Sequence, residues 1–291
     1  MKTRPGSRRL HRLDLNWAHL GLLALTAALA AAALHLAASP VLTLVTGLVL
    51  TVGWLMLWER LAPYRADWQP TARDLARDAG FLGANAVADA LADLLLRAAM
   101  LGAAMWWPVH GPVRTLPLAV AIVLAIVVAE LGDYALHRLS HRGGWLWRVH
   151  VVHHRMEAVN TSNNFTTHPV NVLLRKLVRL LPLWLLGFGA EAVLVALLFG
   201  QAQSFAAHAN TRGRMGWLNY VIGTAELHRW HHSVRVEEAL NFGSALPLWD
   251  QVFGTFHYPR DGAVRQVGVR GADGVPAPAA TWALLAHPFR R

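Results

Sequence analysis

The sequence predicts an all-α integral membrane protein, for three reasons. The 291 residues are 55% hydrophobic and only 15% charged, whereas an ordinary soluble domain has about 25% charged residues. The apolar residues lie in runs close to the ~20 residues that a helix needs to cross a bilayer. Histidines recur three and four positions apart, the spacing that places side chains on one face of a helix. We expect about four transmembrane helices plus a re-entrant or tilted helical hairpin, with a cytosolic histidine-rich helical cap.

The first two apolar runs predict a helical hairpin. They cover residues 17–38 and 41–58, are separated by Ser39-Pro40, and follow the Arg-rich residues 1–12. A cleavable signal peptide is the alternative for the first run, because Ala37-Ala38-Ser39 resembles a cleavage site. The first run is long for a signal core and a second span follows it directly, so the hairpin is favoured.

Two further spans are predicted before the first histidine pair. Residues 116–136 form the clearest apolar run, and residues 79–107 form a weaker one that ends at Trp106-Trp107-Pro108. The weaker run contains Asn85, Asp89, Asp93 and Arg97. Polar groups in a span usually face protein or water rather than lipid. Asp89, Asp93 and Arg97 are spaced by four and form one polar stripe, which we expect to face protein or water.

The distribution of arginine predicts the topology. The N-terminal segment and residues 59–77 and 137–176 are Arg-rich, whereas the turn at 108–115 has only Arg114. The positive-inside bias places the Arg-rich segments in the cytoplasm, and two hairpins satisfy it. A single crossing by the apolar run 177–205 would put the last histidines on the opposite side. We expect this run to turn back at Gly187-Phe-Gly189.

Composition also limits the function. The net charge is +10 and the pI is near 11.2, but the arginines flank apolar runs and are not interleaved with stacking aromatic residues. Attraction to anionic lipid headgroups therefore explains the charge better than nucleic-acid binding, which we do not expect. The chain has no cysteine. Disulfides, cysteine-ligated iron–sulfur clusters and thiolate-ligated haem are excluded, so electrons for redox chemistry must come from another protein.

Three histidine boxes carry the main chemical signal. They are His137-Arg-Leu-Ser-His141, His150-Val-Val-His153-His154 and His228-Arg-Trp-His231-His232. Each box aims two or three imidazoles at a common point if it is helical. Eight rings are more than one metal ion needs, so the boxes suggest two ions that are held mostly by nitrogen.

Two more histidines stand beside predicted helix ends and raise the number of candidate ligands to ten. His168 lies in Phe-Thr-Thr-His-Pro, and His208 lies where the last apolar run meets the polar tail. Ten rings would give two ions about five nitrogens each and leave positions open for oxygen. The remaining histidines are isolated and are expected at the surface or in the core: His11, His19, His35, His110, His257 and His287.

Imidazole binds iron, zinc and copper, so the boxes alone do not name the metal. The zinc-protease motif H-E-x-x-H is absent, and the Glu-x-x-His pattern of soluble di-iron bundles is not evident. Glu157 and Glu226 lie near the boxes and either orient the rings by hydrogen bonds or remain solvated. Asn241 and Trp249-Asp250 follow the third box and are expected to pack or hydrogen-bond within the cap.

Residues 115–258 resemble the fatty acid hydroxylase / sterol desaturase superfamily of membrane di-iron enzymes, closest to its bacterial, alkylglycerol-monooxygenase-like branch. The matching motifs run from Asp133 to His141, from His150 to His154, from Glu226 to Ser233 and from Asn241 to Phe256. The resemblance implies two iron ions as cofactors and O2 as co-substrate. It implies these metal ligands: His137, His141, His150, His153, His154, His228, His231 and His232, with His168 and His208 as looser matches.

The resemblance implies that the enzyme hydroxylates an unactivated C–H bond of a fatty acyl, sterol or ether lipid. A desaturase that uses the same site is the alternative. Either needs a separate electron-transfer partner of reductase, ferredoxin or cytochrome type. A metal transporter is less consistent with the sequence, because its ligands would lie near the bilayer midplane and the boxes lie outside the apolar runs. A purely structural scaffold would leave the paired histidines without a role.

Four regions follow from this interpretation. Residues 1–16 form a basic N-terminal segment, and residues 17–114 form an N-terminal transmembrane region. Residues 115–258 form a fatty acid hydroxylase-like catalytic domain, and residues 259–291 form a peripheral C-terminal tail. The expected location is a multi-pass protein of a bacterial inner membrane with the histidine boxes on the cytoplasmic side.

Overall fold

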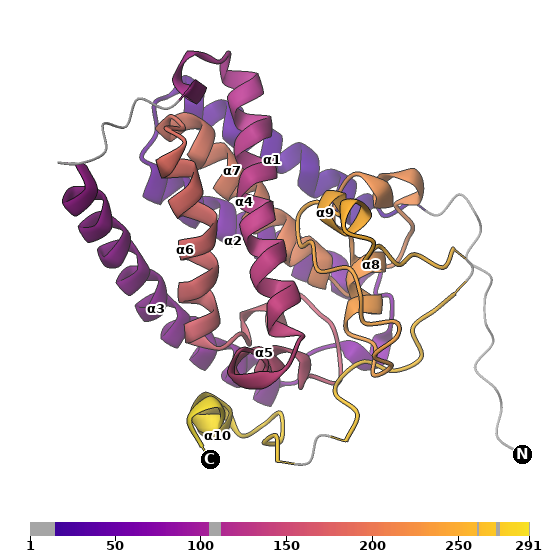
Figure 1. Cartoon of the computed structure of the whole chain (residues 1–291). Helices are drawn as coiled ribbons and strands as arrows, with labels where there is room; N and C mark the ends of the chain where they lie inside the picture. The colour runs from indigo at the N-terminus through magenta and orange to yellow at the C-terminus, as the bar shows by residue number, and fades with distance from the viewer. Residues whose placement is uncertain (1–14, 105–111, 261, 272–273, 291) are drawn as a thin grey trace, which may run out of the picture.

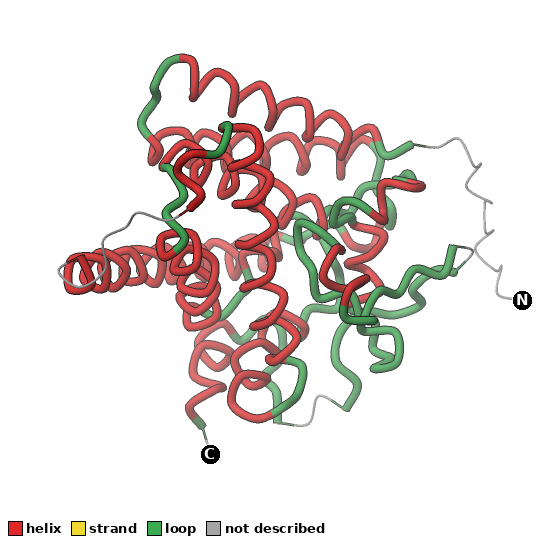
Figure 2. Tube along the Cα trace, turned by 45° about the horizontal axis from the view of Figure 1, so that its top comes forward, coloured by secondary structure: helices red, strands yellow, loops and turns green. Residues whose placement is uncertain are grey.

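The computed structural model describes residues 15–104, 112–260, 262–271 and 274–290, and this part of the chain is helical without a named strand (Figures 1 and 2). The long helices are α1 (Trp17–His35), α2 (Pro40–Leu61), α3 (Ala72–Ala104), α4 (Leu118–Ser140), α6 (Pro169–Leu185) and α7 (Ala190–His208). The short ones are α5 (Gly144–His154), α8 (Ala225–His231), α9 (Leu248–Val252) and α10 (Thr281–Ala286). Five 3-10 turns join them: η1 (Ala66–Trp68), η2 (Pro112–Thr115), η3 (Ser162–Phe165), η4 (Gly216–Tyr220) and η5 (His287–Phe289). The all-α prediction is confirmed.

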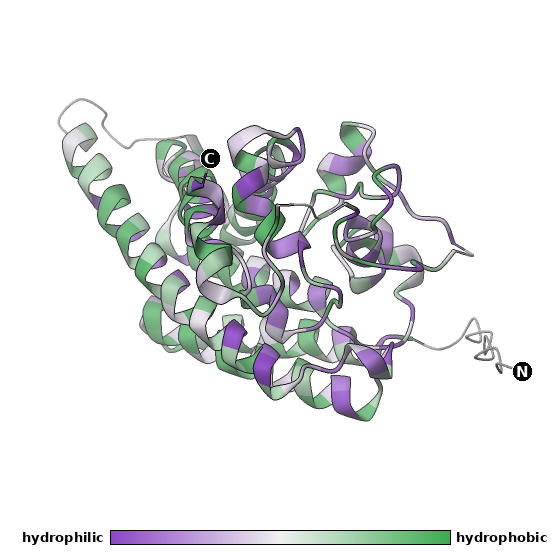
Figure 3. Cartoon of the chain, turned by 90° about the horizontal axis from the view of Figure 1, so that it is seen from below, coloured by the Kyte–Doolittle hydropathy of each residue, from purple (hydrophilic) through white to green (hydrophobic). Residues whose placement is uncertain are grey.

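Among the described residues, four helices are long and apolar enough to cross a membrane: α1, α2, α4 and α7. Figure 3 shows apolar residues predominating along the long helices. The predicted number of four is therefore met, but α7 takes the place of the weaker run 79–107. Residues 79–104 of that run lie within α3, where Asp89 and Asp93 lower the apolar character. Both carboxylates lie 2.8 Å from the ammonium of Lys176 on α6, so this part of the polar stripe faces protein as expected.

The long helices form three consecutive pairs that each begin and end near one end of the bundle. Asn16, just before α1, donates to Thr211, and Glu59 near the end of α2 accepts from the backbone N–H of Asn210. Arg77, near the start of α3, contacts Thr166, which lies just ahead of α6. His137 lies near the end of α4, His168 directly before the start of α6, and His208 at the end of α7. All three predicted histidine boxes can therefore lie on the same side.

The run 177–205 turns back where the sequence predicts it. α6 ends at Leu185 and α7 begins at Ala190, and Gly187 between them has a φ of +78°, a left-handed conformation that glycine adopts without steric cost. Phe188 in this turn packs against the same apolar core as Val113 and Leu116, which precede α4. Since the histidines are at the other end of α4, the pair α6 and α7 extends along the length of α4 and is not a shallow loop.

Two apolar cores hold the pairs together. Leu22 of α1, Leu55 of α2 and Phe205 of α7 meet in one core. Ala125 and Ala129 of α4 meet α6 and α7 in the other. The small alanine side chains let helices approach closely, which places the ends of α4 and α7 beside each other.

The C-terminal tail is more than a surface segment. Leu284 of α10 is fully buried and packs with Phe81 of α3 and with Val152 and Met156 of the α5 region. Residues 259–291, which we expect to form a peripheral tail, therefore include a helix that packs against the region of α5, the helix that carries the second box. The predictions for residues 1–14 and for Trp106-Trp107-Pro108 lie outside the described residues.

Candidate metal centre

Nine of the ten predicted ligands come together in two adjacent groups. The five-histidine group consists of His137, His141, His150, His154 and His231. The four-histidine group consists of His153, His208, His228 and His232. Within each group the candidate ligand atoms, one from each ring, lie within 4.8 Å of one another. Segments that are up to 95 residues apart in the sequence, from His137 to His232, therefore converge at one end of the bundle.

Two short helices supply rings to both groups. On α5, His150 and His154 are one turn apart and enter the five-histidine group, while His153 enters the other. On α8, His231 enters the five-histidine group, while His228 and the residue after the helix, His232, enter the other. The groups consequently touch: the rings of His154 and His232 are stacked with centroids 4.3 Å apart.

The geometry of the five-histidine group fits a metal ion. The Nε2 atom of His154 lies 3.0 Å from Nε2 of His150 and 3.1 Å from Nε2 of His231. Two nitrogens bound to one ion at about 2.0–2.1 Å and at right angles would be separated by about 3.0 Å. The Nε2 atoms of His137 and His141 are buried and have no hydrogen-bond partner within the chain. Buried polar atoms normally have a partner, so a metal ion accounts for this arrangement.

The four-histidine group has the same character. Nε2 of His208 lies 2.9 Å from Nε2 of His153, and Nε2 of His232 lies 3.0 Å from Nε2 of His228. All four residues are buried, with His232 only 1% exposed. With one ring fewer than its neighbour, this group leaves more of the coordination sphere of a bound ion for other ligands.

Burial keeps the rings neutral, which is the form that binds metals. It lowers the pKa of His141 to about 3 and that of His153 to about 4, from the ordinary value of 6.5. Burial and the neighbouring rings also lower the pKa values of the other box histidines outside α4 well below 6.5. These are His150, His154, His228, His231 and His232. Each of these rings can therefore present a lone pair at neutral pH.

The opposite ring nitrogen of four histidines has an oxygen as its partner. The pairs are His137 Nδ1 with Phe242 O (2.6 Å), His231 Nδ1 with Leu240 O (3.0 Å), His153 Nδ1 with Thr166 O (3.2 Å) and His208 Nδ1 with Asn163 Oδ1 (3.1 Å). An N–H at Nδ1 that donates to oxygen selects the tautomer with a free lone pair at Nε2 and holds the ring plane. These are the contacts expected around metal ligands.

His168 is not brought to either group. Its Nε2 lies 3.0 Å from the carbonyl oxygen of Leu285, and its Nδ1 accepts from the backbone N–H of Val170. It therefore caps the start of α6 and contacts the C-terminal tail. The sequence could not separate it from His208, because both stand beside helix ends.

The two glutamates near the boxes do not orient rings. Glu157 pairs with Arg155 and its side chain is 70% exposed. Glu226 accepts from the backbone N–H of Met215 and from the hydroxyl of Tyr258. The ring-orienting hydrogen bonds that we considered for these carboxylates are instead made by three backbone carbonyls and the side-chain amide of Asn163. Of the isolated histidines, His19 is buried in the core, and its Nε2 lies 2.8 Å from Oε1 of Gln203.

A small cavity borders both groups and is lined by residues of α4, α5, α6, α7 and α8 and of the segments beside them. Five of the nine histidines border it, together with small and polar side chains: Leu136, Asn164, Thr167, Asn171, Arg175, Ser204, Ala207 and Ser244. Arg175 is held in place by Asp133 of α4, with its Nε 2.6 Å from one carboxylate oxygen. The cavity is the place where a substrate could meet the metal centre. Sequence reasoning missed Asn171 and Arg175, whose positions on α6 carry no motif.

The residues after the third box hold the cap together, as expected. Asn241 donates to the carbonyl oxygens of Leu227 and His257, and its φ of +63° places it in the left-handed region. Asp250 accepts from the backbone N–H groups of Phe242 and Gly243. The loop that carries the carbonyls behind His137 and His231 is thus itself held by side chains.

Comparison with known proteins agrees with this geometry. Residues 122–255 match the fatty acid hydroxylase family. The chain is 34% identical over 253 residues to the ornithine lipid hydroxylase OlsE of Rhizobium tropici, which covers 83% of this chain and 74% of that protein. It is 27% identical over 139 residues to the alkylglycerol monooxygenase of Homo sapiens, which covers 45% of this chain.

The alkylglycerol monooxygenases are longer proteins, and the matched region spans 29% of the human protein and 30% of the one from Danio rerio. No solved structure matches the chain. The relationship to the ornithine lipid hydroxylase extends over most of both proteins, and the matched family region contains all nine clustered histidines. The chain therefore belongs to the fatty acid hydroxylase family and is an oxidoreductase.

Proposed function

We propose that the nine clustered histidines hold two iron ions and that the enzyme uses them with O2 to hydroxylate an unactivated C–H bond of a membrane lipid. The single observation that carries this proposal is the pair of adjacent, buried histidine groups at one end of an apolar helical bundle. Iron, when bound there, supplies O2 activation and C–H oxidation. His168 is left out of the ligand set because its ring nitrogens contact Leu285 and Val170.

The chain's own residues position the substrate and exclude water. The small cavity that α4, α6 and α7 help to line borders rings of both groups, and these helices lie among apolar ones, so we propose that an acyl chain approaches the metal centre from the bilayer on this side. The walls around the histidines are buried, which protects an oxidising site from solvent. The hydrogen bonds at Nδ1 keep the metal-binding nitrogens aimed inward while substrate and product exchange.

The lipid class is proposed from the relatives. An amino-acid-containing lipid of the ornithine type is the first substrate to test, because the relative that matches most of the chain is named as an ornithine lipid hydroxylase. Ether, sterol and simple fatty acyl lipids are the next candidates. Desaturation at the same site is the alternative reaction, since it needs the same oxidising centre.

A separate reductase, ferredoxin or cytochrome is proposed as the electron donor, because the chain contains no cysteine that could ligate an iron–sulfur cluster. We place the enzyme in a bacterial inner membrane with the metal centre at the cytoplasmic face, where the Arg-rich segments favour it. Residues 115–258 are the proposed catalytic domain. They depend on residues 17–114 for support, since Arg77 and Glu59 contact Thr166 and Thr161 beside the second box.

The test uses the full-length protein purified in detergent, with its iron content measured. It is incubated with ¹⁸O2, a chemical or enzymatic reductant and lipid vesicles that contain ornithine lipid, and the lipids are analysed by mass spectrometry. Hydroxylation predicts a product that gains one labelled oxygen, whereas desaturation predicts the loss of two hydrogens. An iron-loaded, folded enzyme that changes no lipid class under these conditions would overturn the proposal. The variant His231→Ala serves as the inactive control.

A further inference from the structure

The two histidine groups take their orienting contacts from two different segments. Residues 160–167, which include η3, provide the oxygens behind His153 and His208 of the four-histidine group. Residues 240–246 provide the carbonyls behind His137 and His231 of the five-histidine group. In the described residues, no hydrogen bond joins residues 160–167 to a ring of the five-histidine group, and none joins residues 240–246 to a ring of the four-histidine group. Each half of the centre therefore has its own support.

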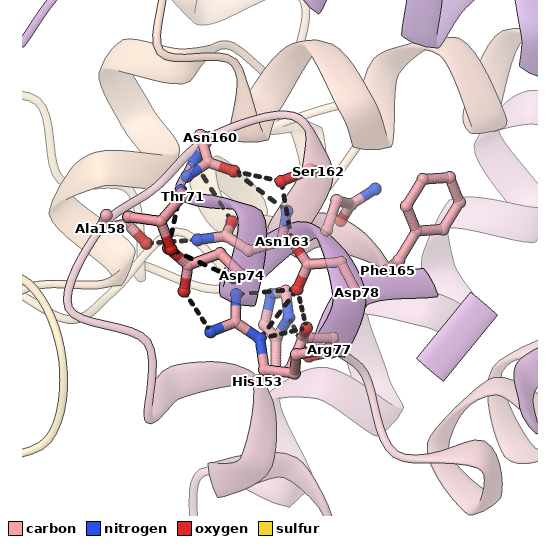
Figure 4. A network of polar contacts seen from close by, with 12 residues as sticks. Thr71, Asp74, Arg77, Asp78, His153, Ala158, Asn160, Ser162, Asn163 and Phe165 are labelled. Atoms are coloured by element: carbon pink, nitrogen blue, oxygen red, sulfur yellow. Dashed lines mark hydrogen bonds and ion pairs between the residues drawn. The ribbon is translucent and has the colours of Figure 1, made fainter. Parts of the chain in front are cut away.

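Asp78 of α3 holds the segment 160–167 (Figure 4). Its Oδ1 accepts from the hydroxyl of Thr166 at 2.6 Å, and its Oδ2 accepts from the hydroxyl of Ser162 at 2.7 Å. Thr166 is the residue whose carbonyl faces His153, and Ser162 precedes Asn163, whose side chain faces His208. A single carboxylate on a distant helix thus contacts the segment beside both of its orienting residues.

The surroundings of Asp78 make this contact rigid. Its side chain is 3% exposed and lies 2.8 Å from the guanidinium of Arg77, whose side chain is 5% exposed. Arg77 also pairs with Asp74, which is 33% exposed and makes no hydrogen bond to residues 160–167. Hydrogen bonds to an ionised carboxylate are stronger than neutral ones, and burial keeps water from competing for them.

Asp250 of α9 plays the equivalent part for the segment 240–246. Its two oxygens accept from the backbone N–H groups of Phe242 and Gly243, both at 2.8 Å, and Oδ1 also accepts from the hydroxyl of Thr255. Asp250 is fully buried. Phe242 is the residue whose carbonyl lies 2.6 Å from Nδ1 of His137. The carboxylate thus holds the peptide unit that contains the orienting carbonyl of Phe242 and the peptide unit before it.

We propose that Asp78 and Asp250 are positioning residues, each for one metal position: Asp78 for the four-histidine group and Asp250 for the five-histidine group. This rests on the proposed metal centre and adds that the orienting contacts of its two halves come from separate segments. Neither carboxylate contacts a histidine ring by a described hydrogen bond, so each acts through its segment. Contacts behind metal ligands typically change metal affinity about 10–100-fold when they are removed.

The experiment titrates metal-depleted, full-length protein with Co(II) in the absence of O2 and follows the ligand-field spectrum and the bound metal. The wild type is expected to bind two ions. Asp78→Ala and Asp250→Ala are each expected to weaken one of the two binding steps about 10–100-fold and to leave the other unchanged. Asp74→Ala is the matched control: it removes a carboxylate partner of Arg77 on the same helix, and both binding steps should persist.

Combination with ligand variants identifies which step is affected. His208→Ala removes a ligand of the four-histidine group, so Asp78→Ala added to it should cause little further loss. Added to His231→Ala, the same change should weaken the remaining step. The pattern should reverse for Asp250→Ala, since residues that act on the same step are not additive.

Folding of each variant is checked by its helical circular dichroism and thermal unfolding. If an alanine variant does not fold, Thr166→Val and Thr255→Val remove one hydroxyl beside each carboxylate at nearly constant volume, and the same selective weakening is expected on a smaller scale. A wild type that binds no metal would contradict the proposed function. A wild type that binds two ions, with variants that weaken both steps equally or neither, would overturn this inference alone.

Discussion

At the scale of single residues, His168 and His208 show what distinguishes a ligand from a capping residue. Both stand beside helix ends, and both are buried. His208 keeps Nε2 within 2.9 Å of His153, whereas both ring nitrogens of His168 contact backbone groups. Whether a ring nitrogen is left for a metal depends on neighbours that lie 55 residues away for His208 and 117 residues away for His168.

This difference predicts opposite results for two substitutions. His231→Ala removes one nitrogen of the five-histidine group and should abolish binding of one metal ion and the lipid oxidation. His168→Ala should keep both ions and lose only a local cap contact, at a cost of about 0.5–2 kcal/mol in the free energy of unfolding. Metal analysis of the two purified variants checks this. Equal metal loss in both would contradict the assignment of nine ligands.

The neutral histidines also predict how the stability of the metal-depleted protein depends on pH. The folded pKa of His141 is about 3 and that of His153 about 4, both below the ordinary 6.5. Between those values and 6.5 the unfolded chain binds more protons than the folded one, so the free energy of unfolding falls as the pH falls. Each such histidine contributes up to about 1.4 kcal/mol per pH unit in this window. Above about pH 6.5 the histidines are neutral in both states, so the stability lost on acidification is fully present there.

Thermal unfolding in detergent with a chelator, between about pH 7.5 and about pH 5, measures how the stability of the metal-depleted protein changes with pH. The midpoint should fall steeply below about pH 6.5, and His141→Phe should make the fall shallower because it removes one titrating ring. A midpoint that stays constant or rises on acidification would contradict the buried, neutral state of the rings.

At the scale of helices, the approach of α4 to α6 sets the distance between the first box and the cavity. Gly132 of α4 lies so close to α6 that a Cβ at this position would overlap the carbonyl of Val178. The next residue, Asp133, makes the ion pair with Arg175 beside the cavity. A side chain at 132 would therefore separate the two helices where they position the site.

Gly132→Ala is expected to destabilise the protein by about 1–3 kcal/mol, the usual cost of overpacking. Gly53→Ala is the matched control, because a Cβ at this glycine in α2 would have no neighbour within 4 Å. The control should be neutral or stabilising by up to about 1 kcal/mol, since alanine favours helix. Thermal unfolding of the two variants measures the difference. A Gly132→Ala variant as stable as the control would show that α4 and α6 do not pack this closely.

At the scale of the whole molecule, three pairs of helices that start and end near the metal centre place every histidine box at one end of the bundle. The turn between α1 and α2 contains Leu36, which is 72% exposed and lies at the far end. Trp282 of α10 is 83% exposed on the side of the metal centre. The cytoplasmic orientation that we propose therefore predicts opposite accessibility for these two positions.

The chain has no cysteine, so a single introduced thiol reports its side of the membrane without background. Leu36→Cys should react with a membrane-impermeant maleimide added to intact spheroplasts. Trp282→Cys should react only after the membrane is opened. Labelling of Trp282→Cys in intact spheroplasts, with Leu36→Cys protected, would reverse the proposed orientation.

Sequence by itself determined the helical class, the three boxes and the turn at Gly187, because hydropathy and the spacing of three and four residues act within a few turns of one helix. Tertiary structure decided the rest. Only packing divides the rings into groups of five and four, leaves His168 outside them, and brings Asp78 of α3 behind His153. His231 lies beside His154, 77 residues away, and Thr166 donates to Asp78, 88 residues away. No local periodicity records which of many polar residues will meet over such separations.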